Sequence, residues 1–238
     1  MEPQRGSICI KMKFIIITLF PEMFEGFLSC SILKRAQEKG HIEVEFINLR
    51  DFGLGKRKQV DDTPYGGGAG MVLRVDVVAK AIESAKSIYP NAKTILLTPQ
   101  GETFDQQLAG KLTKEKGLIL ICGHYEGFDE RIRALVDQEL SIGQYILTGG
   151  ELAAGVVIDT VARLIPGTLG KVESIGEETY MCKGQIEYPQ YTKPEEWKGQ
   201  KVPDVLLSGH HQKISEWRKA QSDLKTKKTK KIKLVDGH

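Results

Sequence analysis

The sequence predicts an α/β protein with a mostly parallel sheet, and three observations support this prediction. Short β-rich runs alternate with longer stretches whose apolar residues recur at helical spacing, which is typical of an α/β fold. Two apolar runs, residues 118–122 and 145–147, are each followed by a turn that contains glycine, GHYEG and TGGE. The pattern fades after Pro166-Gly167, so a second and smaller unit is expected beyond this point.

The first expected strand, residues 13–19, follows basic residues and so resembles a signal peptide. No small-residue cleavage site follows it, and an apolar run over 14–20 is too short to span a bilayer. We therefore interpret it as a buried strand of a protein without a membrane segment. Further along, Asp76 is a candidate helix N-cap, because apolar residues follow it at helical spacing. The expected strands are 13–19, 42–48, 93–98, 117–122 and 145–147, and the expected helices are 22–38, 76–88, 103–115, 127–138 and one near 151–163.

The region after residue 167 changes in character. Residues 168–180 are polar and lack apolar periodicity, which indicates a linker, and a helix is expected over 209–222. The predicted organisation is an α/β domain over 1–165, a linker over 166–180 and a small helical domain with a basic tail over 181–238.

Composition indicates a soluble protein with an ordinary core, since 40% of the 238 residues are hydrophobic and 27% are charged. Six lysines and two aspartates fall within 221–238, a net charge of +4 in a chain whose net charge is +3. This basic tail suits contact with a polyanion, although a disordered, solubilising terminus would have the same composition. The four cysteines are scattered and favour neither a zinc site nor a disulfide framework; they are Cys9, Cys30, Cys122 and Cys182.

Two common nucleotide-binding motifs are absent. The first expected strand runs into Phe20-Pro21-Glu22 without the glycines of a Rossmann fingerprint. The glycine-rich stretch 65–71 has no Lys-Ser/Thr pair, so it is not a P-loop. Ligands of α/β proteins bind at the carboxyl edge of the sheet, where GHYEG and TGGE are expected. The two turns therefore predict a small molecule held largely by backbone groups, in a pocket of another kind.

The chain resembles the bacterial tRNA (guanine-N1)-methyltransferases, which are knotted (SPOUT) methyltransferases, from about residue 12 to residue 222. The resemblance rests on motifs that occur in the same order as in the family. They are FPEMF (20–24), RDF (50–52), VDDTPYGGGAGM (60–71), TPQG (98–101), CGHYEGFDER (122–131), SIGQYILTGGE (141–151), RLIPG (163–167), YPQYTKP (188–194) and VPDVLLSGHH (202–211).

The resemblance implies a deep trefoil knot around residues 95–150 that holds S-adenosylmethionine. The cofactor is expected in loops 97–101, 123–127 and 142–150, with apolar side chains against the adenine and glycine amides exposed to its ring nitrogens and ribose. Residues 1–11 precede the expected start of the family and are interpreted either as an extension or as the product of an upstream start assignment. The expected cofactor-binding residues are Leu97, Thr98, Pro99, Gly123, Tyr125, Ile142, Gly143, Tyr145, Leu147, Gly149 and Gly150.

The implied reaction is methylation of N1 of guanosine 37 in tRNA, which requires a carboxylate base and a cation near O6. Arg163 matches the cation of the family. The family usually carries Asp-Ser-Phe where this chain has Glu178-Thr179-Tyr180, so Glu178 is the expected base and Glu177 the alternative. Magnesium is expected for activity and the residue matching Glu126 is implicated, but no residue is assigned as a metal ligand.

The resemblance also implies a cytoplasmic homodimer whose active sites are shared between subunits. Asp61 matches the residue that reads the guanosine before the target, and the glycine loop with Gly70 allows close approach of the RNA. The basic helix and tail of the second domain are expected to contact phosphates of the anticodon stem-loop.

Two other functions fit the sequence. A knotted enzyme that methylates ribose 2′-hydroxyls would need neither the VDDTPYGGG loop nor a linker acid, so its activity would survive Glu178→Ala. A catalytically silent RNA-binding protein is supported by the exchange of aspartate for glutamate and by the short C-terminus. Such a protein would bind cofactor and tRNA without turnover.

Overall fold

A computed structural model describes residues 12–169 and 186–235, with the side chains of the last helix described as far as Thr229. The chain divides into two units, residues 1–170 and 171–238, and each is described by itself. No helix in the described ranges combines the length and apolar character needed to cross a membrane.

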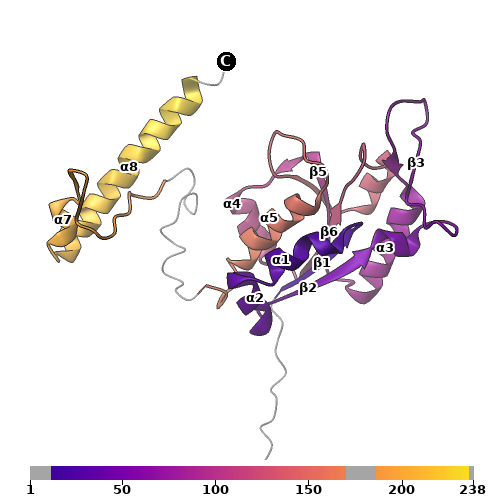
Figure 1. Ribbon diagram of the computed structural model, residues 1–238, viewed down its shortest axis with the longest axis horizontal. Helices are drawn as coiled ribbons and strands as arrows, with labels where there is room; N and C mark the ends of the chain where they lie inside the picture. The colour runs from indigo at the N-terminus through magenta and orange to yellow at the C-terminus, as the bar shows by residue number, and fades with distance from the viewer. Residues whose placement is uncertain (1–11, 170–185, 236–238) are drawn as a thin grey trace, which may run out of the picture. The chain divides into compact units, whose positions relative to one another are not determined.

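The first unit is built on a five-stranded parallel sheet in the order β2-β1-β6-β5-β7 (Figure 1). This confirms the predicted α/β fold with a mostly parallel sheet. The prediction of a strand at 145–147 is wrong, because these residues form an open loop. The fifth strand of the sheet is formed by residues 138–141 instead. The strands are β1 (Met12–Thr18), β2 (Ile42–Asn48), β5 (Lys93–Thr103), β6 (Gly117–Cys122) and β7 (Gln138–Ser141).

Helices cover both faces of this sheet because its central strands are apolar on both faces. In β1, Phe14 and Ile16 pack into one core and Ile15 and Ile17 into the other, as the alternation of side chains along a strand requires. The first core includes residues of α1 (Glu25–Leu28), α2 (Ser31–Glu38), α4 (Gln106–Leu112) and α5 (Glu151–Ala162). The second core includes residues of α3 (Val75–Ile88), η2 (Leu49–Phe52) and η3 (Glu130–Leu135).

Several expected helices differ from those observed. Residues 22–38 form three pieces, η1 (Pro21–Phe24), α1 and α2, because Cys30 is extended and Ser31 has a φ of 51°. In the region 103–115, the first residue belongs to β5 and the helix is limited to α4. The region 127–138 contains the short η3 and ends at the first residue of β7. These differences arise where tertiary packing overrides a local helical pattern.

Asp76 is not the N-cap of α3, which begins one residue earlier with Arg74 as its cap residue. The Asp76 carboxylate lies in the first turn, where it accepts hydrogen bonds from the Val77 amide and from the Arg74 side chain. These bonds lower the pKa of Asp76, and the guanidinium is the largest cause. A carboxylate in the first turn also interacts favourably with the helix dipole.

The second unit is organised around one long helix. It contains the hairpin of β8 (Glu196–Trp197) and β9 (Gln200–Lys201), the short α7 (Asp204–Leu207) and α8 (His211–Val235). The helix extends well beyond the predicted residue 222 and includes most of the basic tail. Lysine is a good helix former and neither glycine nor proline interrupts the chain before Gly237, so the helix can continue.

Candidate ligand site at the carboxyl edge of the sheet

The ends of β1 and β6 and the start of α5 meet at the carboxyl edge of the sheet. The amide of Gly150 donates to the carbonyl oxygen of Gly123 over 2.8 Å. A Cβ atom on Gly150 would lie 2.7 Å from both Cα of Cys122 and the amide nitrogen of Gly123. The two backbones are therefore in direct contact, which only glycine at position 150 permits.

This contact gives a different explanation for the glycine at position 150 than the one expected from the sequence. The Gly150 amide was expected to face the cofactor, but it bonds to Gly123, so close packing of two chain segments explains its presence. Gly149 is similarly constrained, because a Cβ there would lie 2.4 Å from Oε2 of Glu151.

A buried carboxylate lies directly beneath these loops. Glu151 is only 3% exposed, and its Oε1 accepts a hydrogen bond of 2.7 Å from the hydroxyl of Thr18, which is fully buried. Its Oε2 has no hydrogen-bond partner among the described residues and lies 3.7 Å from Nε2 of His124. Glu151 is the first residue of α5, where the helix dipole favours a negative charge.

The neighbours of this carboxylate are fixed in turn. The Thr18 hydroxyl accepts from the Phe20 amide at 3.0 Å, and the Phe20 ring lies 4.8 Å from the ring of His124. Burial and the charge of Glu151 raise the pKa of the Cys122 thiol well above its ordinary value. Sequence analysis did not single out Thr18, His124 or Glu151, although the last two belong to the motifs GHYEG and TGGE.

The segment 97–103 forms a second wall of the site. Leu97 is buried at the end of the regular pairing of β5, while Pro99 is exposed and Thr98 half-buried. The register between β5 and β7 shifts between Leu97 and Glu102, so the intervening residues bulge. A Cβ on Gly101 would lie 2.5 Å from the amide nitrogen of Leu140, which again shows close packing of two backbones.

The loop 142–150 presents apolar groups to solvent. Tyr145 is 54% exposed and Ile146 80% exposed, while Leu147 is half-buried. Gly143 has a φ of +154° and packs against the Tyr145 ring, where a Cβ would lie 2.4 Å from Cε1. The Tyr145 hydroxyl donates to the carbonyl of Ile142. The loop thus holds an exposed ring in a defined position.

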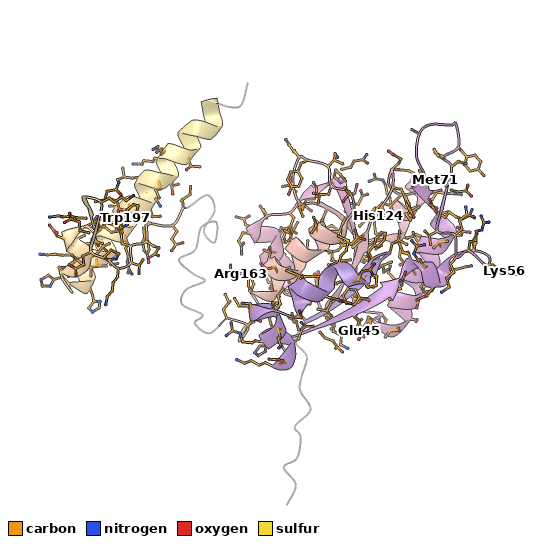
Figure 2. The ribbon with its side chains drawn as sticks, viewed as in Figure 1. Glu45, Lys56, Met71, His124, Arg163 and Trp197 are labelled. Carbon is orange, nitrogen blue, oxygen red and sulfur yellow. The ribbon has the colours of Figure 1, made fainter. Side chains whose placement is uncertain are left out.

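A hairpin borders the turn after β6. It consists of β3 (Asp61–Asp62) and β4 (Val72–Leu73), joined by the glycine loop. The Glu126 amide donates to the Met71 carbonyl at 2.9 Å, and the Leu73 amide donates to the Gly127 carbonyl at 3.0 Å. Met71 and His124 are labelled in Figure 2.

Three of the predicted residues come together at this hairpin. Gly70 has a φ of +82°, and a Cβ there would lie 2.6 Å from Oε1 of Glu126. Tyr125 has a φ of +60° and is 44% exposed. Burial and the charge of Asp61 raise the Tyr125 pKa, and Arg50 opposes this shift. Asp61, Gly70 and Glu126 therefore border one surface beside the candidate cofactor loops.

Arg163 is not part of this surface. It is the C-cap of α5, whose first residue is Glu151, so it lies roughly 18 Å along the helix from the buried carboxylate. Figure 2 shows Arg163 well away from His124 within the first unit. The predicted base Glu178 and its alternative Glu177 lie outside the described residues.

Among residues 12–169 and 186–235, no group of three or more His, Cys, Asp or Glu side chains could hold a metal ion. Glu126 is an exposed single carboxylate in a turn. The described residues thus do not by themselves form a magnesium site, and no catalytic step is assigned to the ion. Cys30 and Cys122 are free thiols, exposed and buried respectively.

The family described as tRNA (guanine-1)-methyltransferase TrmD matches residues 12–236 of the sequence. The chain belongs to this family. This confirms the resemblance that the ordered motifs indicated. The match covers the sheet, the loops at its carboxyl edge and all of the described second unit.

Relatives support the family membership over nearly the whole chain. A tRNA (guanine-N(1)-)-methyltransferase from Geobacter sp. (strain M21) is 52% identical over 227 residues, which cover 95% of this chain and 90% of the relative. The protein of the same description from Carboxydothermus hydrogenoformans is 56% identical over 216 residues, with coverages of 90% and 84%. The crystal structure of the tRNA (m1G37) methyltransferase from Aquifex aeolicus has a TM-score of 0.78 and 36% identity, and the match covers 95% of this chain and 99% of that one.

Proposed function

We propose that this protein transfers a methyl group from S-adenosylmethionine to N1 of guanosine 37 in tRNA, giving 1-methylguanosine beside the anticodon. Membership of the tRNA (guanine-1)-methyltransferase family over residues 12–236 is the observation that carries the proposal. The convergence of the bulged end of β5 with loops 123–127 and 142–150 at one edge of the sheet supports it, because ligands of parallel α/β sheets bind there.

The cofactor binds among these loops and supplies an electrophilic methyl group on its sulfonium sulfur. The exposed side chains of Tyr125, Tyr145 and Ile146 give the apolar surface that an adenosine moiety can cover. Glu151 lies buried below the loops and fixes the start of α5 relative to β1, which keeps the loops in place. The residues proposed to contact the cofactor are Leu97, Thr98, Pro99, Gly123, Tyr125, Ile142, Gly143, Tyr145, Leu147, Gly149 and Gly150.

The segment 142–150 also supports the trefoil knot. After β7 at the edge of the sheet, the chain returns so that Gly150 bonds to Gly123 at the end of the central strand β6. The following helix α5 packs against β6 and β1. A loop that passes inward and contacts another backbone directly is what threading of the chain requires, and glycine allows that contact.

The substrate guanine would lose its N1 proton to a carboxylate while N1 forms a bond to the methyl carbon and the carbon–sulfur bond breaks, which leaves S-adenosylhomocysteine. Glu178 is this base and Glu177 the alternative, and a positioned base contributes roughly 10²–10⁴-fold to the rate. Negative charge that develops at O6 is stabilised by the guanidinium of Arg163. Glu126 borders the substrate surface beside Gly70, and as a single exposed carboxylate it does not by itself hold a magnesium ion.

The active site is assembled from two copies of the chain. Within one copy Arg163 lies at the opposite end of α5 from the cofactor loops, so a second copy has to supply the cation. Exposed apolar side chains on α5 support a subunit interface there: Leu152 is 59% exposed and Val156 44% exposed. Phe27 of α1, also exposed, lies 3.8 Å from where a Cβ on Gly155 would be, which extends the same patch.

The tRNA substrate contacts the β3–β4 hairpin and the second unit. Asp61 accepts from the guanosine that precedes the target, and Gly70 lets the RNA backbone approach. The target base has to leave its stack, because N1 lies on the Watson–Crick edge. Residues 1–165 form the catalytic domain, 166–180 the linker that carries the base, and 181–238 the tRNA-binding domain, in a protein that acts in the cytoplasm.

The test is transfer of label from S-adenosylmethionine to an unmodified tRNA with GG at positions 36 and 37, in the presence of magnesium. The same tRNA with G37→A and the Glu178→Ala protein are the controls. Label on the first tRNA alone, lost in the variant, supports both the substrate and the base. Label that survives in Glu178→Ala moves the base to Glu177 or supports ribose methylation. Cofactor and tRNA binding without any label would overturn the enzymatic function.

A further inference from the structure

The second unit contains a cavity of about 310 Å³ that takes no part in the site described above. The extended segment 188–195, α7 and the first turns of α8 enclose it, and these elements lie within one unit (Figure 1). Its volume is at the lower end of the range for pockets that hold small ligands. The lining includes Tyr188, Tyr191, Lys193, Leu206, Ile214 and Arg218.

Arg218 gives this cavity a fixed hydrogen-bond donor. The central carbon of its guanidinium lies 4.8 Å from the centroid of the Tyr188 ring, so a cation–π contact orients the planar group. Its Nε is buried and has no hydrogen-bond partner among the described residues. Arg218 also lines the cavity, and a guanidinium carries only hydrogen-bond donors, so its matching partners are acceptors. The position therefore favours a ligand with oxygen or ring-nitrogen acceptors.

Tyr191 gives the same cavity an accessible aromatic face. Its side chain is 49% exposed, and its ring lies 6.3 Å from the ring of Trp217 on α8. Unstacked RNA bases are held in proteins by aromatic rings and by arginine planes, with hydrogen bonds to the base edges. Residues 186–235 also carry twelve basic and six acidic residues, a net charge of +6, which attracts a polyanion.

We propose that this cavity binds one unstacked nucleotide of the tRNA, distinct from the guanosine that is methylated. Its base stacks on Tyr191, and an acceptor of the nucleotide accepts a hydrogen bond from the Arg218 guanidinium. The proposal rests on the proposed function, because it takes tRNA as the substrate. Tyrosine and arginine together distinguish this site from a simple phosphate contact, for which a surface lysine would be enough.

The test measures the Kd of the full-length protein for the unmodified tRNA with GG at positions 36 and 37. Tyr191→Ala removes the ring, and Arg218→Lys keeps the charge but removes the planar group and its Nε donor. Each variant is expected to weaken tRNA binding by about 10-fold, the magnitude typical of one base stacked on an aromatic ring. The matched control is Trp197→Ala, which removes an exposed ring on the β8–β9 hairpin outside the cavity and is expected to leave the Kd unchanged.

Three further readouts separate this site from a structural role. Thermal unfolding, cofactor binding and kcat at saturating tRNA should match the unchanged protein, since the cavity does not touch the reacting base. If either Tyr191→Ala or Arg218→Lys binds tRNA with unchanged affinity, the proposal is overturned. Methylation of the tRNA by the unchanged protein is measured in the same experiment and tests the proposed function separately, because its outcome does not depend on the cavity variants.

A second measurement avoids variants altogether. The unchanged protein is irradiated with ultraviolet light in complex with the same unmodified tRNA, so that a base of any type can cross-link, and the cross-linked peptides are identified by mass spectrometry. Cross-links at Tyr188 or Tyr191 are expected, because a nucleotide in the cavity lies against these rings. Cross-links confined to the first unit or to the lysines of α8 would contradict the proposal.

Discussion

The hydroxyl of Thr18 donates a hydrogen bond of 2.7 Å to the carboxylate of Glu151, across 133 positions of the chain. Both side chains are buried, and they connect the end of β1 with the first turn of α5. The loop that ends at Gly150 is proposed to hold the cofactor, so this bond supports the ligand site from below without reaching the solvent.

Replacing Thr18 by valine should reduce the free energy of unfolding by about 1–3 kcal/mol, because the buried carboxylate loses its hydroxyl donor. The measurement is urea unfolding followed by circular dichroism. Thr160→Val is the matched control, since its hydroxyl bonds only to the Val156 carbonyl within the same helix. That change should stay within about 0.5 kcal/mol. Equal losses in the two variants would refute the importance of the Thr18–Glu151 bond.

Gly150→Ala should destabilise the protein by about 1–3 kcal/mol, because the added methyl group overlaps the backbone of Cys122 and Gly123. It should also weaken S-adenosylmethionine binding, measured by calorimetry, since the loop has to move. Gly110→Ala in α4 is the matched control, because a Cβ there has no neighbour within 4 Å. Alanine in a helix should stabilise that variant by about 0.5–1 kcal/mol. Normal cofactor affinity in Gly150→Ala would show that the loop tolerates displacement.

Gly70→Ala should reduce kcat/KM for tRNA by roughly 10–100-fold, because its methyl group displaces the Glu126 side chain beside the proposed substrate surface. Gly66→Ala separates this contact from backbone strain. Gly66 has a φ of +88°, close to the +82° of Gly70, but a Cβ there meets no atom within 4 Å. Steady-state kinetics measures kcat/KM for both variants. A similar decrease in kcat/KM in each would show that backbone strain in the loop, and not the contact with Glu126, is responsible.

Leu152→Glu should convert the proposed homodimer into monomers and abolish methyl transfer, because a charge is placed in an apolar subunit interface. Sedimentation equilibrium measures the association state. Leu224→Glu is the matched control, since both leucines are 59% exposed and Leu224 lies on α8 of the second unit. Dissociation by neither variant, or by both equally, would place the interface elsewhere.

The Cys122 thiol should make stability fall at alkaline pH. Burial and the charge of Glu151 raise its pKa in the folded protein, so the unfolded chain loses the thiol proton first as the pH rises. The contribution of the thiol to the free energy of unfolding is complete below the pKa of cysteine in the unfolded chain, which is about 8.5. Above that pH it is lost, at up to about 1.4 kcal/mol per pH unit. Urea unfolding of the unchanged protein and of Cys122→Ala between pH 7 and 10 measures the difference. Parallel pH profiles would contradict this.

Much of the first unit follows from local patterns in the sequence. The runs around Phe14, Ile95 and Leu120 are strands because β-branched and apolar residues fill both faces of a parallel sheet. The run around Val44 is an edge strand in which apolar residues alternate with glutamates. The helical period over 76–88 predicts α3 almost to the residue. The motifs GHYEG and TGGE direct attention to the correct edge of the sheet, because ligand sites of α/β proteins occupy the carboxyl ends of strands.

Other features depend on contacts between distant segments, which no local pattern reports. Residues 145–147 are apolar enough for a strand, but β7 takes the sheet edge and leaves Ile146 80% exposed in a loop. The glycine at position 150 suggested an amide open to a ligand, whereas its amide bonds to Gly123.

The sequence by itself determined the family, the parallel sheet and the loops that border the candidate site, because these depend on residue type and spacing along the chain. Only the tertiary structure decided that Thr18 bonds to Glu151 and that Arg163 lies at the far end of α5 from the loops. It also decided that Tyr188 orients Arg218 in a separate cavity. Burial and pairing between positions far apart in the chain are set by packing, and packing is a property of the folded chain as a whole.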